Sequence, residues 1–453
     1  MPAIPTLKIS ISGVRGVIGE SLTPLLLTRF SQAFGTYVGP GTIVIGRDPR
    51  RSGEMVRQAV IAGLLSTGCR VVDIGMCPVP TIQLLVRHLK ALGGVAITAS
   101  HNPAEWNALK FIGGDGLFLS GDNAREMLDI YHQGEYTKVP GTEMRGLENL
   151  PGATDRHIKT IIDALGALPA TVRKLRVVLD ACNGAGSVVG PRLLEALGAE
   201  VIAINVTPDG SFPRPAEPLP ENLGALSAAV KEHRADIGFA QDMDADRLAI
   251  VSDEGIPIGE DYTLVLAALR VLNHQTGSVV ANLSSTSVLQ AVADRFNSRL
   301  FLTKIGEVNV TQEMQRQNAV VGGEGNGGVI YPQINFARDS LVGMGLVLHL
   351  LAETGQTITQ LVDGLPRFSM LKDKLPCPSH KIGAVLRMLR TEYATYPMDL
   401  RDGVKVQLPK AWFLVRGSNT EPIIRVISEA QTDMEVQEVL EEVVSKVKRC
   451  LAA

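Results

Sequence analysis

The repeated alternation of short, β-branched segments with amphipathic helical segments constrains the fold of this chain more than any other feature. Buried strands are predicted at Thr42–Gly46, Arg70–Ile74, Gly94–Ile97, Leu175–Asp180, Gly277–Ala281 and Arg299–Leu302. Helical periodicity at 55–65 and 81–92 separates the first three strands, and further helices are expected after the glycine turn 183–186 and from Ser287. Because the pattern restarts twice, it predicts three successive α/β units.

The end of the chain has a different character. The segment Leu365–Pro378 contains several prolines and predicts a linker to a last, smaller domain. That domain contains an expected strand at Trp412–Val415 and ends in a charged helix over 434–447. The proline-rich stretch Pro208–Pro220 is predicted to be a loop within the second unit. The sequence shows no close internal repeat.

Composition limits the classes of partner. The 453 residues are enough for two to four domains, and 44 Lys plus Arg against 47 Asp plus Glu give a formal charge of -3. No overall field therefore attracts nucleic acid or an anionic membrane. The five cysteines lack metal-site spacing and indicate reduced thiols. Since we find neither a leader pattern nor an apolar run of about 18 residues, we expect a soluble cytoplasmic protein.

Three carboxylates at alternate positions, Asp242, Asp244 and Asp246, precede Arg247. Such crowded carboxylates repel one another unless a cation lies between them, and oxygen ligands suit Mg²⁺ or Ca²⁺. One alternative is a solvated acidic turn. A calcium loop of EF-hand type is disfavoured, because that loop needs Gly where Arg247 stands and Glu where Asp253 stands. Predicted strands at 235–240 and 248–251 flank the motif, so we expect a metal loop between two strands.

A polar turn, Thr98–Pro103, follows the predicted strand Gly94–Ile97. Ser100 in this turn is expected to be exposed enough to react, although an ordinary turn would have the same composition. No G-x-S-x-G elbow surrounds it, which disfavours a serine hydrolase. His101 is adjacent in sequence, which does not make it a base. Lys110 follows ten residues after Ser100. It either lies in the same cleft as the serine turn or is an ordinary solvated lysine.

Two later loops also carry polar chemistry. The glycine-rich segment Gly322–Gly328 contains Glu324 and Asn326, whose side chains suit sugar hydroxyls, although a hairpin turn is the alternative. It lacks the Lys-Ser/Thr ending of a P-loop. The segment Arg416–Pro422 combines an arginine with hydroxyl, amide and backbone N–H groups, which suit a phosphate. A helix cap or turn would explain part of that segment.

Together these four loops resemble those of the α-D-phosphohexomutase family. The matching motifs are T-A-S-H-N-P at 98–103, D-x-D-x-D-R at 242–247, G-G-E at 322–324 and R-x-S-x-T-E-P at 416–422. The family also has segments similar to Ser12–Gly16 and Gly46–Gly53, so the resemblance spans nearly the whole chain. It implies a heart-shaped enzyme with a central cleft, in which three α/β domains with mixed sheets precede a smaller α+β domain. The boundaries are then expected at 1–152, 153–253, 254–366 and 367–453.

The resemblance also implies roles for individual residues. Ser100 would be phosphorylated and would join Asp242, Asp244 and Asp246 around Mg²⁺. Arg15 and Arg247 would hold the phosphoryl group, whereas His101 and Lys110 would handle protons or stabilise charge. Glu324 and Asn326 would bind sugar hydroxyls. The phosphate that is not reacting would be bound by Arg416, Ser418, Asn419 and Thr420, with Arg425 assisting.

The implied reaction converts a hexose 1-phosphate and a hexose 6-phosphate into each other, with a hexose 1,6-bisphosphate as intermediate and activator. The sugar phosphate is the expected partner, and the protein is expected to be a monomer or homodimer. A non-catalytic sugar-phosphate binder is one alternative, and a Mg²⁺-dependent phosphatase using aspartyl-phosphate chemistry is another.

The chain departs from the commonest family pattern in two loops. In G-E-x-S-G-H, Asn326 replaces the serine and Gly328 replaces the histidine, so a proton-transfer role for that histidine does not carry over. In the phosphate loop, Gly417 and Asn419 also differ from the usual residues. The G-E-G-N-G-G form resembles phosphoglucosamine mutases and broad phosphomannomutase/phosphoglucomutase enzymes. We favour glucosamine phosphate as the substrate, although the single carboxylate of Glu324 does not separate amino from hydroxyl sugars.

Overall fold

The computed structural model describes residues 6–10, 13–169, 174–418 and 422–452. The chain forms two compact units, the first with residues 1–270 and 326–359 and the second with residues 271–325 and 360–453. All five cysteines carry free thiols, as the sequence predicts. Among the described residues, no helix is both long enough and apolar enough to cross a membrane.

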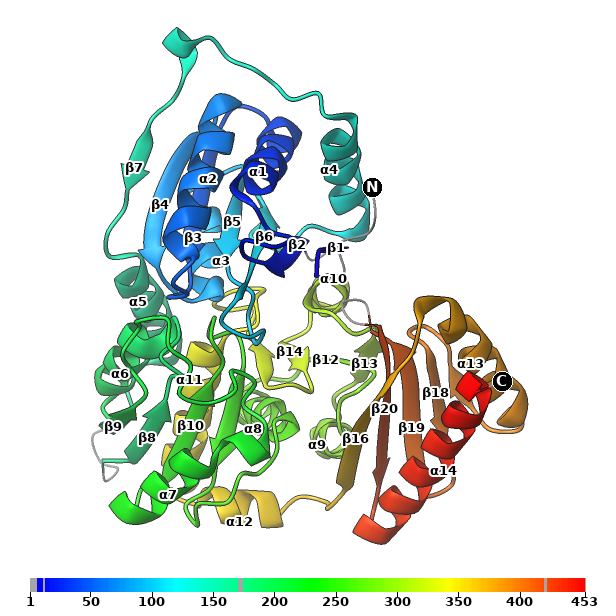
Figure 1. Cartoon of the computed structure of the whole chain (residues 1–453). Coiled ribbons are helices and arrows are strands. Elements are labelled where there is room, and N and C mark those ends of the chain that lie inside the picture. The colour runs from blue at the N-terminus through cyan, green and yellow to red at the C-terminus, as the bar shows by residue number, and fades with distance from the viewer. Residues whose placement is uncertain (1–5, 11–12, 170–173, 419–421, 453) are drawn as a thin grey trace. The chain divides into compact units, whose positions relative to one another are not determined.

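The first unit begins with a mixed, seven-stranded sheet of order β1-β2-β6-β5-β3-β4-β7 (Figure 1). Its strands are β1 (Lys8–Ser10), β2 (Gly13–Val17), β3 (Thr42–Arg47), β4 (Arg70–Met76), β5 (Gly93–Ile97), β6 (Trp106–Gly113) and β7 (Leu147–Asn149). β3 pairs in parallel with β4 and β5, whereas β6 runs antiparallel to β5 and β2. The strands predicted at 42–46, 70–74 and 94–97 are confirmed as β3, β4 and β5.

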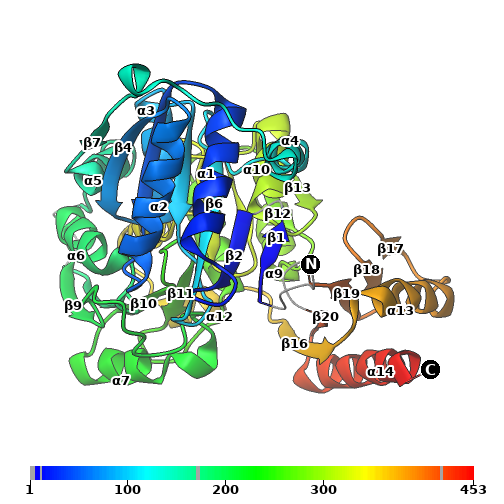
Figure 2. The same cartoon turned by 45° about the horizontal axis from the view of Figure 1, so that its top comes forward.

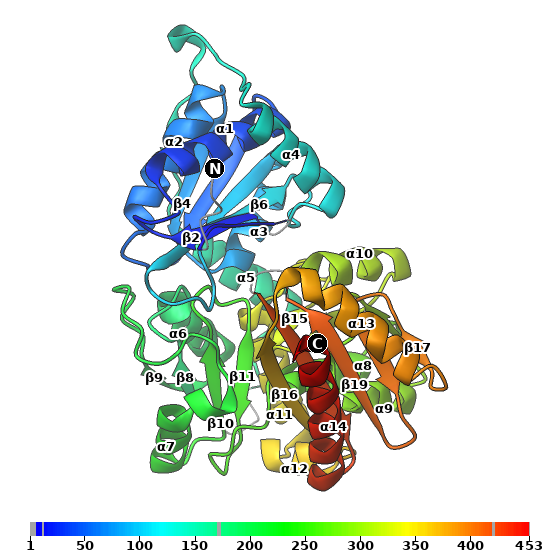
Figure 3. The ribbon, with the colours of Figure 1, turned by 45° about the vertical axis from the view of Figure 1, so that its right-hand side comes forward.

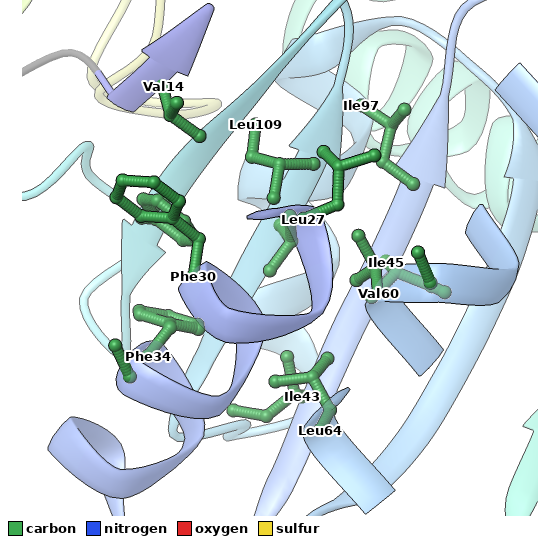
Figure 4. Packing of buried hydrophobic residues seen from close by; sticks show 14 of the residues in the cluster. Val14, Leu27, Phe30, Phe34, Ile43, Ile45, Val60, Leu64, Ile97 and Leu109 are labelled. Atoms are coloured by element: carbon green, nitrogen blue, oxygen red, sulfur yellow. The ribbon is translucent and has the colours of Figure 1, made fainter. Parts of the chain in front are cut away.

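Helices cover both faces of this sheet. They are α1 (Pro24–Val38), α2 (Gly53–Ser66), α3 (Val79–His88) and α4 (Gly121–Gln133), and Figure 2 shows α1 and α2 side by side. Side chains alternate across β3, so that Ile43 and Ile45 pack with α1 and α2 while Val44 packs with α3. Phe30 and Phe34 of α1 complete the first of these cores (Figure 4).

Local signals fix the start of α1. Thr23 precedes the helix, and its hydroxyl accepts a hydrogen bond from the backbone N–H of Leu26 at 3.3 Å. Pro24 occupies the first turn, where its missing N–H costs nothing. Leu27, Phe30 and Phe34 then recur on one face at helical spacing, and all three are buried. The apolar face of α1 therefore packs toward the sheet.

A second sheet of the first unit has the order β11-β10-β8-β9. Its strands are β8 (Arg176–Asp180), β9 (Glu200–Ile204), β10 (Ile237–Gln241) and β11 (Leu248–Val251), and the nearby helices are α5 (Ala153–Leu165), α6 (Gly186–Leu197) and α7 (Gly224–His233). β8 pairs in parallel with β9 and β10, whereas β10 and β11 are antiparallel. The six residues Asp242–Arg247 thus form the connection between β10 and β11, as the sequence predicts.

The third α/β region follows. Its strands are β12 (Val279–Asn282), β13 (Leu300–Thr303), β14 (Val321–Glu324) and β15 (Gly328–Ile330). Its helices are α8 (Asp261–Leu272), α9 (Ser287–Arg295), α10 (Glu307–Gln317), α11 (Ser340–Thr354) and α12 (Ile358–Asp363). β12 pairs in parallel with β13 and with β14. The strands predicted at 277–281 and 299–302 and the helix predicted from Ser287 are confirmed as β12, β13 and α9.

The last region is an antiparallel sheet of order β16-β20-β19-β18-β17, which confirms the α+β prediction. Its elements are β16 (Ser369–Pro376), α13 (Ser379–Glu392), β17 (Met398–Asp399), β18 (Val404–Gln407), β19 (Ala411–Gly417), β20 (Ile423–Ala430) and α14 (Asp433–Ala452). Figure 3 shows α13 and α14 lying beside each other on this sheet. The predicted linker 365–378 is wrong in part, because most of it forms β16. A proline at the end of this strand is tolerated, since β16 lies at the edge of the sheet.

Candidate active site

Ser100 lies in the turn between β5 and β6 and is almost completely buried. Its backbone φ is +49°, in the left-handed region that non-glycine residues seldom adopt. The N–H of Ser100 donates to the hydroxyl of Thr98 at 3.0 Å. The Ser100 hydroxyl donates to Oδ2 of Asp242 at 3.0 Å. The predicted serine loop and the predicted metal loop therefore meet through this hydrogen bond.

Arg50 fixes the shape of the serine turn, Thr98–Pro103, through hydrogen bonds to its backbone. Its side chain is fully buried, forms an ion pair with Asp48 at 3.0 Å and donates to four backbone carbonyls. Those acceptors are Ser100 at 2.6 Å, Asn102 at 2.6 Å, Pro103 at 2.5 Å and Trp106 at 2.9 Å. Arg50 lies in the segment Gly46–Gly53, which resembles the family, but its role is not predictable from the sequence. No spacing rule links a residue to a turn 50 positions later.

The metal loop is a tight turn in which every carboxylate is buried. Asp242, Asp244 and Asp246 have no exposed surface, and one oxygen from each lies within 4.8 Å of the others. Ala245 has φ +56°, a second left-handed residue at the site. The N–H groups of Asp246 and Arg247 donate to Oδ1 of Asp242 at 3.2 and 3.3 Å. This backbone conformation turns the three carboxylates toward one another.

The oxygens of Asp244 and Asp246 show whether this cluster is a closed network of ion pairs or a site that still has room for a cation. Oδ2 of Asp244 accepts from Lys110 Nζ at 2.7 Å, and Oδ2 of Asp246 accepts from Arg338 Nη2 at 2.5 Å. Oδ1 of Asp244 and Oδ1 of Asp246 are buried and have no hydrogen-bond partner among the described residues. Burying such oxygens without partners is costly. A hard divalent cation, which prefers oxygen ligands, would compensate for that cost.

The electrostatics of Asp242 and Asp244 differ. Burial, together with the charges of Asp244 and Asp246, raises the pKa of Asp242 well above its usual value. Burial also opposes ionisation of Asp244, but the ammonium of Lys110 outweighs it and lowers the pKa of Asp244. Lys110 is thus a buried ion-pair partner and not a solvated lysine. A divalent cation would favour the ionised form of Asp242 in the same way.

A second group of cations lies around the serine turn. Arg247 contacts Glu217 at 3.1 Å and His101 Nδ1 at 3.3 Å, and its Nε lies 3.8 Å from Asp246 Oδ1. Because a guanidinium only donates, Nδ1 of His101 must accept, which places the imidazole proton on Nε2. Burial, with the charges of Arg247 and Arg15, lowers the pKa of His101 well below its usual value. His101 is therefore a neutral imidazole.

Arg15 comes from β2 and reaches the same turn. Its Nη1 donates to Oδ1 of Asn102 at 2.6 Å. The first unit therefore brings together the five residues predicted as catalytic, Ser100, Arg15, His101, Lys110 and Arg247, and the three aspartates predicted, with Ser100, as metal ligands. Glu217 and Arg338 were not predicted from the sequence, because they are single charged residues outside any recognisable motif.

The predicted sugar loop is divided between the two units. Glu324 belongs to the second unit, where it is 3% exposed. Its Oε1 accepts from Asn282 Nδ2 at 2.9 Å and from the N–H of Gly306 at 2.8 Å. Asn326 belongs to the first unit, and its Oδ1 accepts from the N–H of Gly328 at 3.3 Å. Glu324 is therefore held by a side-chain amide and a backbone N–H in a fixed orientation.

The predicted phosphate loop connects β19 to β20. Arg416 and Arg425 are directly opposite each other on these antiparallel strands, so their side chains lie on the same face. Nε of Arg416 donates to Asp402 at 3.2 Å, and the N–H of Ser418 donates to the carbonyl of Ile423 at 2.9 Å. The other two predicted phosphate ligands, Asn419 and Thr420, lie outside the described residues.

Asp402 links the phosphate loop to the sugar loop within the second unit. Its Oδ1 accepts from Arg416, and its Oδ2 accepts from the N–H of Ile305 at 3.0 Å. The next residue, Gly306, donates to Glu324. Neither Asp402 nor Ile305 lies in a recognisable motif, so this connection is not predictable from the sequence.

Nearly the whole chain matches the domains of one known protein family. Residues 7–138, 155–255 and 259–368 match the alpha/beta/alpha domains I, II and III of the phosphoglucomutase/phosphomannomutase family, and residues 375–446 match its C-terminal domain. A protein of Methanopyrus kandleri named probable phosphoglucosamine mutase is 37% identical, over 97% of each chain. A phosphoglucomutase/phosphomannomutase of Thermococcus kodakarensis is 36% identical, over 95% of this chain and 96% of that one.

Solved structures are similar over the same extent. A phosphoglucomutase/phosphomannomutase family protein from Burkholderia thailandensis aligns with a TM-score of 0.86 at 26% identity, over 98% of both chains. A putative phosphomannomutase from Thermus thermophilus aligns with a TM-score of 0.82 at 27% identity, over 99% of this chain and 100% of that one. The similarity in sequence and in structure thus covers all four regions described above.

Proposed function

The chain belongs to the phosphoglucomutase/phosphomannomutase family, and on this premise we propose that it interconverts the 1-phosphate and 6-phosphate of a hexose through a phosphoserine at Ser100. Phosphohexomutases are isomerases, which fits a site that contains a hydroxyl nucleophile and several cations. The observation that carries the proposal is the 3.0 Å hydrogen bond from the Ser100 hydroxyl to Asp242. It places the nucleophile directly against the carboxylate cluster.

Asp242, Asp244, Asp246 and Ser100 would hold Mg²⁺. The buried oxygens of Asp244 and Asp246 that have no hydrogen-bond partner among the described residues support this assignment. When bound, the ion would neutralise charge on the phosphoryl group. Phosphoryl transfer depends mainly on positioning and electrostatics, so this is the main help that an ion gives. Arg15 and Arg247 bring two further positive charges to the serine turn and would hold the phosphoryl oxygens.

The proposed transfer has two steps. In the first, a substrate hydroxyl oxygen forms a bond to the phosphorus of phospho-Ser100 as the bond from Ser100 Oγ to phosphorus breaks, and the substrate's hydroxyl proton passes to Ser100 Oγ. In the second, Ser100 Oγ takes the other phosphoryl group from the hexose 1,6-bisphosphate and the proton returns to the departing oxygen. Lys110, paired with Asp244, suits charge stabilisation, and the neutral imidazole of His101 suits proton handling.

We assign the sugar and its second phosphate to the remaining loops. Glu324 and Asn326 would bind hydroxyls present in both substrate orientations. Arg416, Ser418, Asn419 and Thr420 would bind the phosphate that is not reacting, and Arg425 would assist. Two arginines facing each other on adjacent strands repel, and a bound phosphate relieves that repulsion.

The proposed sugar is glucosamine phosphate, because several relatives, including one at 37% identity, are named probable phosphoglucosamine mutase. The alternative is broad phosphoglucomutase/phosphomannomutase activity, which the name of the Thermococcus relative supports. The proposed cofactors are Mg²⁺ and a trace of hexose 1,6-bisphosphate that maintains phospho-Ser100. The free thiols suit a cytoplasmic protein, and we propose a monomer or homodimer.

Substitution Ser100→Ala tests the proposed nucleophile. It removes the only oxygen of Ser100 that is able to carry the phosphoryl group, so turnover should be abolished while the unfolding transition is retained. The matched control is Ser66→Ala in α2, which should keep full activity. Mass spectrometry after incubation with hexose 1,6-bisphosphate should find phosphate on Ser100. Phosphate on Asp242 with release of inorganic phosphate would favour the phosphatase, and an active Ser100→Ala variant would refute the mechanism.

A further inference from the structure

Position 328 has no room for a side chain. Gly328 is buried at the start of β15, and a Cβ built there would lie 2.3 Å from Cδ and 2.9 Å from Cγ of Arg338. Its neighbour Gly327 has φ +86°, but Gly328 is not among the residues with positive φ. Position 328 therefore requires glycine for space and not for backbone freedom. With Arg338 in this place, the histidine of the commoner loop pattern would not fit.

The backbone that carries Arg338 is held from several directions. Asp339 caps α11, with Oδ1 accepting from the N–H groups of Leu341 at 2.9 Å and Val342 at 3.4 Å. The N–H of Asp339 donates to the carbonyl of Val329 at 2.8 Å. Oδ2 of Asp339 pairs with Nε2 of the fully buried His157 at 2.8 Å. Arg338 is thus presented by a rigid scaffold.

The guanidinium of Arg338 reaches the third carboxylate of the metal loop. Nη2 lies 2.5 Å from Oδ2 of Asp246, and Arg338 is only 8% exposed. Oδ1 of the same carboxylate has no hydrogen-bond partner among the described residues. The contact therefore fixes one oxygen of Asp246, while the other oxygen, 3.8 Å from Arg247 Nε, is not hydrogen-bonded to a described residue and is available to a ligand. The planar guanidinium orients a carboxylate better than an ammonium does.

We propose that Arg338 is a positioning residue for the cation site: it holds Asp246 Oδ2 so that Oδ1 is presented to Mg²⁺, and Gly328 provides the space that this contact needs. Partners that orient metal ligands commonly contribute 10–100-fold to metal affinity or activity, as an order-of-magnitude range. The inference rests on the proposed function, because it presumes that the three aspartates hold a cation.

Calorimetric titration of the purified full-length chain with Mg²⁺ alone tests this role without relying on turnover. Arg338→Gln should weaken Mg²⁺ affinity by about tenfold or more, and Arg338→Lys should restore only part of the loss. The matched control is Arg270→Gln, since Arg270 also pairs with a carboxylate, that of Glu353 at 2.8 Å, which is not one of the metal-loop carboxylates. The control should keep wild-type Mg²⁺ affinity.

Unchanged or tighter Mg²⁺ binding in Arg338→Gln would overturn the positioning role while leaving the proposed function intact. A wild-type protein that binds no Mg²⁺ would instead refute the cation site itself, and with it this inference. Phosphorylation of Ser100 is measured separately, so the two failures are distinguishable. Unfolding curves of each variant ensure that affinities are compared only between folded proteins.

Gly328→Ala provides an independent test, because it leaves Arg338 in the chain and displaces it by collision. We expect weaker Mg²⁺ binding in Gly328→Ala. In an Arg338→Ala background, the same change at 328 should have little further effect, since the colliding atoms are gone. Full affinity in Gly328→Ala, or equal effects of Gly328→Ala in both backgrounds, would contradict the proposed coupling between the two positions.

Discussion

Two residues of the candidate active site adopt the left-handed backbone conformation, Ser100 with φ +49° and Ala245 with φ +56°. Such a conformation costs a non-glycine residue about 1–2 kcal/mol. For Ser100 the cost is offset by its N–H bond to Thr98 and by the bond from Arg50 to its carbonyl. The turn therefore holds its conformation through buried polar contacts that a surface turn would lack.

Arg50→Lys should damage both stability and activity. A lysine has three donors at one nitrogen and is not able to reach four carbonyls and the Asp48 carboxylate together. Leaving such buried groups unpaired costs about 2–4 kcal/mol in free energy of unfolding, measured by urea denaturation. The neighbouring Arg51 is exposed, so Arg51→Lys is the control. Equal stability of the two variants would show that the buried contacts are unimportant.

At this scale the sequence predicted the residues that lie in motifs and missed those that act from a distance. Ser100 and the three aspartates were recognisable because each lies in a short pattern. Arg338 is 92 positions from Asp246, and Glu217 is 30 positions from Arg247. Neither pair has a local signal, since only the packing of different elements brings the partners together. Their roles became visible only with the fold.

At the scale of elements, the antiparallel sheet aligns three cations across adjacent strands. Lys374 of β16 is opposite Arg425 of β20, and Arg425 is opposite Arg416 of β19. Cross-strand neighbours share a face, so the three positive charges form a row. Asp402 offsets part of the charge of Arg416, and the repulsion that remains along the row would favour an anion such as the proposed substrate phosphate.

Lys374→Gln should weaken binding of inorganic phosphate or sugar phosphate by about two- to fivefold, because an exposed charge contributes roughly 0.5–1 kcal/mol. Added salt should reduce this difference. Lys372→Gln is the control, since Lys372 is also exposed on β16 but lies opposite Ile427. Titration by calorimetry checks both variants. Similar losses in both would indicate a general charge effect and contradict a specific row.

The contact between α13 and α14 carries a prediction for alkaline pH. The hydroxyl of Tyr393 donates to Glu442 Oε1 at 2.8 Å, and burial together with this bond raises the pKa of Tyr393 to about 12. The folded state therefore favours the neutral phenol more than the unfolded chain does, because the pKa of a tyrosine in the unfolded chain is 10.0. This contribution to stability is fully present below pH 10 and is lost as pH rises through about 12.

Urea unfolding at pH values from about 9 to about 12 measures how the free energy of unfolding depends on the ionisation of Tyr393. Tyr393→Phe should be less stable at neutral pH but should lose less stability than the wild type as pH rises. The control is Tyr396→Phe, whose parent side chain is 39% exposed. A Tyr393→Phe variant with the same alkaline loss as the wild type would assign that loss to other groups.

The sequence predicted the elements with apolar cores better than those at edges. Strands such as β3 and β12 were predictable because both faces are buried and the apolar run is continuous. β16 was mistaken for a linker because it carries Lys372, Asp373 and Lys374 and ends at Pro376. An edge strand tolerates these residues, so its sequence resembles that of a loop.

At the scale of the whole molecule, the order of four regions was predictable but the path of the chain through them was not. The chain leaves the first unit after residue 270 and returns to it at 326. α11 then packs against α5 and α6, two helices that come much earlier in the sequence. Periodicity identifies each helix but not the helix that it contacts. The domain boundaries taken from sequence therefore remain predictions.

Mg²⁺ should stabilise the folded molecule, because only folding brings the three buried carboxylates together. An ion that binds the folded state alone adds about 2.7 kcal/mol at a concentration 100 times its Kd. Thermal unfolding with Mg²⁺ and with excess chelator checks this expectation. In Asp246→Asn the increase in Tm should be smaller. An identical Tm with Mg²⁺ and with chelator would argue against a cation at this cluster.

The proposed function depends on the transfer of a phosphoryl group by phospho-Ser100 between the two ends of a hexose phosphate. Phosphorus NMR of the purified protein with Mg²⁺ and a trace of hexose 1,6-bisphosphate tests it most directly, with glucosamine, glucose and mannose 1-phosphates supplied in parallel. We predict conversion to the 6-phosphate, fastest for glucosamine 1-phosphate, and none with Ser100→Ala. Persistence of all three 1-phosphates, although Ser100 is shown to be phosphorylated, would contradict the claim and favour a sugar-phosphate binder.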